Sequence, residues 1–171
     1  MIEQEITEET EWASTQDVRS LYFLLSYDLI CTKTRPTNMH PNYEKASGYT
    51  GEIIAAAIEV HRTLGPGLVE SIYEWALMKE LELRGFTVCN QRQVTIRYKS
   101  FSREHPLRFD VLIEECVLVE AKAVEQVHPI HKAMLLSYMK LLDIPVGLLI
   151  NFHAEKLTDG VSRFILPGAN L

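Results

Sequence analysis

Cysteine is scarce in this chain, and no two cysteines have the spacing of a metal clip. Cys31, Cys89 and Cys116 are the only thiols among 171 residues, and none forms a CxxC pair. An odd number of widely spaced cysteines argues against a disulfide framework and against a structural zinc site. It favours a reducing compartment, so we expect a cytoplasmic protein.

Long hydrophobic runs are also lacking. The best candidate for a membrane segment, LYFLLSYDLIC at 21–31, covers 11 residues and contains Asp28, whereas a spanning helix needs about 20 apolar residues. The first twenty residues hold six acids and a single base, Arg19, which is the reverse of a secretory signal. We therefore expect no membrane association and no signal peptide.

A general excess of positive charge is missing, because the formal net charge is -6. The bases are nevertheless concentrated: six of them fall between Arg84 and Arg108, where the only acid is Glu104. Two interpretations remain open for this span. It forms either a local basic face for nucleic acid or a set of solvated side chains on an exposed β-meander.

The chain is long enough for one domain with a substantial core. Residues 1–47 are predicted to be an N-terminal extension and linker, poorly ordered, because they start acidic and end in a polar stretch broken by Pro36 and Pro41. The domain itself is predicted to cover 48–171.

Hydrophobic periodicity within 48–171 predicts an α/β or α+β sandwich with a mixed sheet. The second predicted helix carries Leu68, Ile72, Leu77 and Leu81 on its inward face and stops at Gly85. The predicted elements are helices over 49–64 and 68–84, strands over 93–98, 107–113 and 117–124, a helix over 129–142, a strand over 146–152 and an edge strand over 161–166.

Three charged residues interrupt the apolar run RFDVLIEECVLVEAKAV at 108–124. Strand side chains alternate between the two faces of a sheet, so Glu120 and Lys122 point the same way. A three-residue turn at 114–116 places Asp110 directly opposite Glu120, whereas a two- or four-residue turn would separate them. We therefore expect all three charges on one face.

Two explanations fit such a cluster. Facing carboxylates repel unless a cation lies between them, and either Lys122 or a divalent ion could be that cation. Mg²⁺ commonly uses one or two carboxylates together with water and substrate phosphate. On geometry alone, a salt-bridged trio that merely closes one end of the sheet is as good an explanation as a metal site.

The order Asp110, Glu120, Lys122 resembles the D…ExK core of the PD-(D/E)XK nuclease superfamily. Residues from about 50 to 166 look like the GxxExxY proteins assigned to that superfamily, with the name motif at Gly67, Glu70 and Tyr73 in GLVESIYE. The further segments RFDVLI, LVEAKAV, PIHKAMLLSYMKL and VGLLINF follow in the same order.

This resemblance implies a restriction-endonuclease-like α/β/α core with a central mixed β-sheet flanked by helices. It also implies a metal-dependent nuclease that hydrolyses phosphodiester bonds in DNA or RNA. Asp110, Glu120 and Glu70 would bind Mg²⁺ or Mn²⁺, and Lys122 would orient or activate the attacking water. Those four residues are the candidate catalytic set, and the candidate substrate contacts are Tyr138 and Arg108.

One position departs from the pattern of related sequences. Gln commonly stands four residues before the tyrosine in a QxxxY motif, whereas this chain has Met134 before Tyr138. Methionine cannot hydrogen-bond a phosphate or base in that role. The alternative is therefore a non-catalytic nucleic-acid or protein-binding module that retains the nuclease fold.

Overall fold

The structure, a computed structural model, describes residues 39–171. The predicted extension lies largely outside these residues, and the domain boundary at 47/48 stays a prediction. The described chain forms, in order, α2 (Tyr43–Leu64), α3 (Glu70–Leu83), β1 (Val88–Tyr98), β2 (Phe101–Ile113), β3 (Val117–Lys122), α4 (Pro129–Leu142), β4 (Val146–Asn151), the 3₁₀ turn η1 (Leu157–Gly160) and β5 (Val161–Ile165).

The five strands form one mixed sheet in the order β1-β2-β3-β4-β5. The first three strands make an antiparallel meander, β4 pairs parallel to β3, and β5 pairs antiparallel to β4 at the edge. The parallel step requires a crossover connection, and α4 provides it. Pro129 begins α4, as predicted, at a position where a missing N–H costs nothing.

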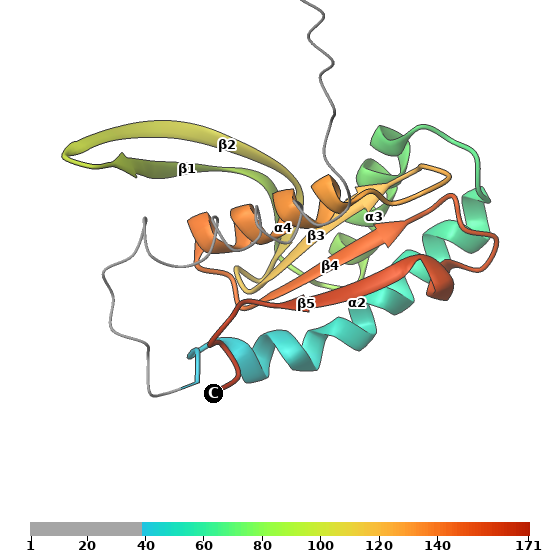
Figure 1. Ribbon diagram of the computed structural model, residues 1–171. Helices are drawn as coiled ribbons and strands as arrows, with labels where there is room; N and C mark the ends of the chain where they lie inside the picture. The colour runs from blue at the N-terminus through green and yellow to red at the C-terminus, as the bar shows by residue number, and fades with distance from the viewer. Residues whose placement is uncertain (1–38) are drawn as a thin grey trace, which may run out of the picture. The chain divides into compact units, whose positions relative to one another are not determined.

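Helices cover both faces of the sheet (Figure 1). On one face, Ile53 of α2 and Leu77 of α3 share a core cluster with Val119 of β3. On the other, Leu135 of α4 shares a second cluster with Leu118 of β3. The predicted α/β fold, with a central mixed sheet between layers of helices, is therefore confirmed.

The helices differ from expectation in start and in phase. Helix α2 begins at Tyr43, six residues before the predicted start. In α3, Leu77 and Leu81 are buried as predicted, but Ile72 is exposed. Leu68, predicted to begin this helix, lies before its start at Glu70 and is also exposed. None of the helices within 39–171 is long and apolar enough to cross a membrane.

The hairpin of β1 and β2 is longer than predicted and extends past the rest of the sheet (Figure 1). Its two strands pair from Gln91 with Arg108 to Tyr98 with Phe101, and we call residues 91–108 the arm. Strand β2 runs straight through Pro106. Proline is tolerated on strands whose second edge is unpaired, and the residues of β2 before Val111 are paired only with β1.

Tyr73 fixes the connection that leads into α3. Its buried ring stacks on Phe152 at a centroid distance of 4.6 Å. Its hydroxyl donates to the carbonyl of Gly65 at 2.6 Å and accepts from the N–H of Leu68 at 3.1 Å. Both bonds hold the α2–α3 loop, and Glu70 is the first residue after that loop in α3.

We expect Tyr73→Phe to lower the free energy of unfolding by roughly 1–3 kcal/mol, because two backbone groups lose their partner. Urea unfolding measures the change. Tyr98→Phe removes a hydroxyl from an exposed ring and serves as the matched control, expected within about 0.5 kcal/mol of the natural protein. Equal effects of the two variants would contradict a structural role for the Tyr73 hydroxyl.

Candidate active site

The sheet divides at Asp110. The β2–β3 ladder contains three pairs, Val111 with Val119, Leu112 with Leu118 and Ile113 with Val117, whereas β3 continues to Lys122 alongside β4. At the point of division the carboxylate of Asp110 accepts the backbone N–H of Ala121 at 2.7 Å. A side chain thus takes over a donor that a neighbouring strand would otherwise satisfy.

An irregularity in the β1–β2 pairing lies at the same place. Cys89 pairs with Leu112 and Gln91 with Arg108, so the single residue Asn90 on β1 faces the three residues 109–111 on β2. Bulges of this kind bend a strand and redirect a side chain, and they are common beside functional sites. This one lets Asp110 turn toward β3 while β2 bends away into the arm.

The predicted register of the β2–β3 hairpin is confirmed. The pairing of Val111 with Val119 leaves 114–116 as a three-residue turn and puts Asp110 and Glu120 at facing positions. Glu120 and Lys122 alternate in step with Leu118, which belongs to the core cluster under α4, so they lie on that face. The three charges therefore converge as the alternation required.

Lys122 is the centre of the cluster. Its ammonium lies 2.8 Å from Glu120 Oε1, 2.9 Å from Glu70 Oε1 and 3.8 Å from Asp110 Oδ2. It also donates to the carbonyl of Ala121 at 2.7 Å. Glu120 is 2% exposed and Lys122 is 6% exposed, so each charge depends on its partners rather than on water. The structure brings together all four candidate catalytic residues, whose roles stay a prediction.

Burial sets the protonation of this cluster. It raises the pKa of Asp110 to about 7, and nearby Glu120 adds to the rise, while Lys122 and the Ala121 N–H oppose it. Burial likewise raises the pKa of Glu120, against the hydrogen bond from Lys122. Burial lowers the pKa of Lys122, but its bonds to Glu120 and Glu70 outweigh this and raise it overall. The Asp110 and Glu120 carboxyl groups therefore hold their protons to a higher pH than isolated carboxyl groups would.

Glu74 is a fourth carboxylate at the site, and it was missed from the sequence. Oxygens of Glu70, Glu74 and Asp110 all lie within 4.8 Å of one another. Glu74 follows Glu70 by one helical turn, so both face the same way; that spacing was the available signal. Carboxylate oxygens are the ligands that Mg²⁺ and Mn²⁺ prefer, so this set fits a hard divalent cation.

Glu120 occupies a different position from the one expected of a ligand. It is not part of the group of converging oxygens formed by Glu70, Glu74 and Asp110, and its Oε1 is bonded to Lys122 instead. Direct metal binding by Glu120 therefore stays a prediction. Its observed contact is the one that holds Lys122.

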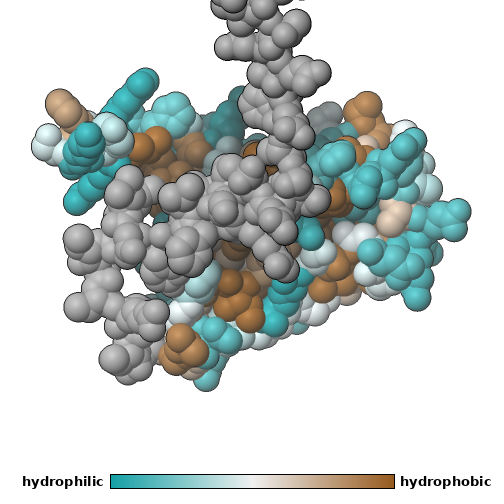
Figure 2. All heavy atoms as spheres, in the orientation of Figure 1, coloured by the Kyte–Doolittle hydropathy of each residue, from teal (hydrophilic) through white to brown (hydrophobic). Residues whose placement is uncertain are grey.

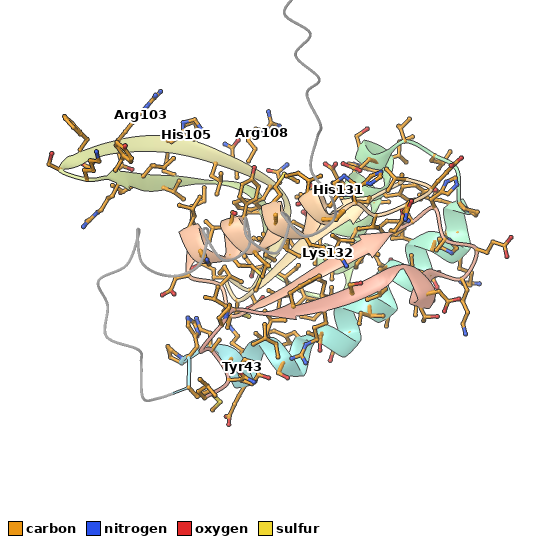
Figure 3. The ribbon with its side chains drawn as sticks, viewed as in Figure 1. Tyr43, Arg103, His105, Arg108, His131 and Lys132 are labelled. Carbon is orange, nitrogen blue, oxygen red and sulfur yellow. The ribbon has the colours of Figure 1, made fainter. Side chains whose placement is uncertain are left out.

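The two candidate substrate contacts have different surroundings. Arg108 is exposed on β2 and lines a hollow together with Glu74, Asn90, Phe109 and Asp110. Figure 3 labels it on the stretch of β2 that leaves the sheet. Tyr138 is half-buried and packs against the core cluster under α4. Arg108 is thus next to the acidic cluster, whereas the observed contacts of Tyr138 are with the core.

The raised pKa of Asp110 predicts a pH-dependent stability. The folded protein keeps this proton up to about pH 7, whereas an unfolded chain loses it near pH 3.8. The contribution of this proton to the free energy of unfolding is therefore complete below pH 3.8 and is lost as the pH rises through 7. Asp110→Asn cannot lose this proton. In EDTA, we therefore expect its free energy of unfolding, minus that of the natural protein, to rise by up to about 4 kcal/mol from pH 4 to pH 8.

Urea unfolding at a series of pH values measures this difference. Glu52→Gln, at an exposed position on α2, is the control, and its difference from the natural protein should not change with pH. A pH-independent difference for Asp110→Asn would contradict the assignment.

Comparison with known proteins gives a superfamily. Residues 47–164, more than half of the chain, match the PD-(D/E)XK nuclease superfamily. Searches of curated proteins and of solved structures found no significant match, and the GxxExxY subgroup stays a prediction. The matched span contains both strands of the carboxylate–lysine cluster, the helix that supplies Glu70 and Glu74, and the crossover helix. The chain belongs to the PD-(D/E)XK nuclease superfamily.

Proposed function

We propose that the protein is a metal-dependent nuclease that hydrolyses phosphodiester bonds in DNA or RNA. The observation that carries this is the contact of one buried ammonium, Lys122, with carboxylates from three separate elements, Glu70 of α3, Asp110 of β2 and Glu120 of β3. Membership of the superfamily supports it. A structural ion-pair network would not need the further carboxylate of Glu74 at the same point.

Glu70, Glu74 and Asp110 would hold the cation, for which Mg²⁺ or Mn²⁺ is the expected identity. When bound, such an ion neutralises charge on the phosphate oxygens and provides a nucleophile at neutral pH. The side chains prepare the site for it. The Ala121 N–H fixes Asp110, and Lys122 spans Glu70 and Glu120.

Lys122 has a second role in this proposal. Its ammonium would contact the scissile phosphate or orient the attacking water. A lysine is suited to this because it is a compact point charge on a flexible stem. Glu120, buried behind it, limits the positions that the ammonium can adopt.

The non-catalytic alternative rests on Met134. This residue is half-buried on α4, where a thioether offers at most a weak acceptor in place of an amide. A module of this class would keep the fold and bind nucleic acid or protein without turnover. Metal binding separates the two functions.

We expect the purified chain to cleave single- or double-stranded DNA or RNA in the presence of Mg²⁺ or Mn²⁺. Glu70→Gln and Asp110→Asn keep the side-chain shapes but remove ligand charge, so each should lower the rate by roughly 100-fold or more. Gel assays of labelled substrates measure this, with Glu52→Gln as the control. Cleavage that is undetectable, or that persists unchanged in both site variants, would exclude the nuclease.

Calorimetric titration with Mn²⁺ or Mg²⁺ tests the site directly. We expect one binding event at pH 8, above the pKa of Asp110, and a roughly tenfold or greater loss of affinity in Glu74→Gln. Glu52→Gln should bind like the natural protein. Failure of the natural protein to bind either ion would favour the non-catalytic module.

A further inference from the structure

The outer half of the arm stands clear of the core. Val94 and Leu107 attach its base to the cluster under α4, but every residue from 95 to 104 is exposed. A two-stranded ribbon of this kind is marginally stable at best without further packing. It contributes little to the core, and its surface is available to a partner.

The positive charge of the described chain is concentrated on this ribbon. The arm has five bases and one acid, a formal charge of +4, whereas the rest of residues 39–171 has nine bases and fifteen acids, a formal charge of -6. Figure 2 shows hydrophilic side chains gathered over the arm. The five bases are Arg92, Arg97, Lys99, Arg103 and Arg108.

Most of these bases are available to an outside partner. Arg92 pairs with Glu115, and the only acid of the arm, Glu104, accepts a hydrogen bond from Thr95. Within the described part of the chain, no carboxylate pairs with Arg97 or Arg103. Figure 3 labels Arg103, His105 and Arg108, spread along β2 of the arm.

Aromatic rings form the tip. Tyr98 and Phe101 pair directly across the two strands and are 63% and 72% exposed. The ammonium of Lys99, in the turn between them, lies 5.3 Å from the centroid of the Tyr98 ring. A tip of this composition offers both a cation for phosphate and apolar surface for base edges and thymine methyl groups.

The shape of the ribbon selects among polyanions. The major groove of B-form DNA admits a two-stranded β-ribbon, whereas the major groove of A-form RNA is too narrow for side chains to read. Strand β2 also connects the arm to the acidic cluster, because Arg108 and Asp110 line the same hollow. A duplex held by the arm would therefore have a backbone beside the carboxylates.

We propose that the arm, residues 91–108, is a duplex-DNA-binding element. It lies in the major groove, with Arg97, Lys99 and Arg103 on phosphates and with Tyr98 and Phe101 leading. Because this assignment takes its substrate class from the proposed function, its test is carried out without cleavage.

The test is the binding of the full chain to a fluorescein-labelled DNA duplex in EDTA, followed by anisotropy at several KCl concentrations. Each phosphate contact contributes about 0.9 to the slope of log K against log salt. We expect Arg97→Ala/Arg103→Ala to make the slope shallower by about 2 and to weaken binding roughly 60-fold at 0.1 M KCl.

Three matched variants separate charge from structure. Arg97→Lys/Arg103→Lys retains both charges and should retain the slope. Tyr98→Ser/Phe101→Ser should weaken binding while leaving the slope unchanged, since apolar contacts with base edges and thymine methyl groups release no counterions. Lys156→Ala removes an exposed base just before η1, outside the arm, and should change neither quantity.

Two results would overturn the assignment. One is the failure of Arg97→Ala/Arg103→Ala to change the salt dependence, either because the slope stays the same or because the natural protein does not bind the duplex measurably. The other is equal affinity for single-stranded DNA or for an RNA duplex of the same length. Arm-dependent duplex binding without any cleavage would instead keep this inference and exclude the nuclease, and cleavage with no arm dependence would do the reverse.

Discussion

The arrangement of the site depends on one buried ammonium. Lys122 lies within 4 Å of carboxylates on α3, β2 and β3, and Glu120 behind it is nearly inaccessible to water. Removing one partner from such a group leaves an uncompensated charge in a low-dielectric interior, which costs far more than an exposed pair contributes. The contact therefore fixes the position of the α3 N-terminus, and with it Glu70 and Glu74, against the sheet.

The same contact requires the sheet to open. A strand buried on both faces has no room for a group of carboxylates, so β2 pairs with β3 only from Val111 onward, and Asp110, just before it, turns its carboxylate toward the Ala121 N–H. The bulge opposite Asn90 accommodates the bend. The residues of β2 before the bulge pair only with β1, which produces the projecting arm. Site and arm are thus two consequences of one division in the sheet.

The alternation of side chains along a strand made part of this predictable, and tertiary contacts decided the rest. Because side chains alternate with a period of two, a three-residue turn puts Asp110 and Glu120 at facing positions. The inward face of α3 was predicted only in part. A structural role for Tyr73 could be expected from the sequence, but its partner Phe152, far away in sequence, could not, and Ile72, predicted to point inward, is exposed. The reach of β2 through Pro106 was missed because proline usually argues against a strand.

The two parts of β2 have surroundings of opposite charge, acidic around Asp110 and basic along the arm. One lysine cannot neutralise four carboxyl groups, those of Glu70, Glu74, Asp110 and Glu120, so in the proposed function a phosphate would be repelled from the site until a cation was bound. The arm carries the opposite charge and stands away from the cluster, so its attraction for a polyanion does not require that cation. If the proposed function holds, grip on the nucleic acid and entry of the reacting phosphate would be separately controlled. Screening by salt would act chiefly on the grip, and the divalent ion on the entry of the phosphate.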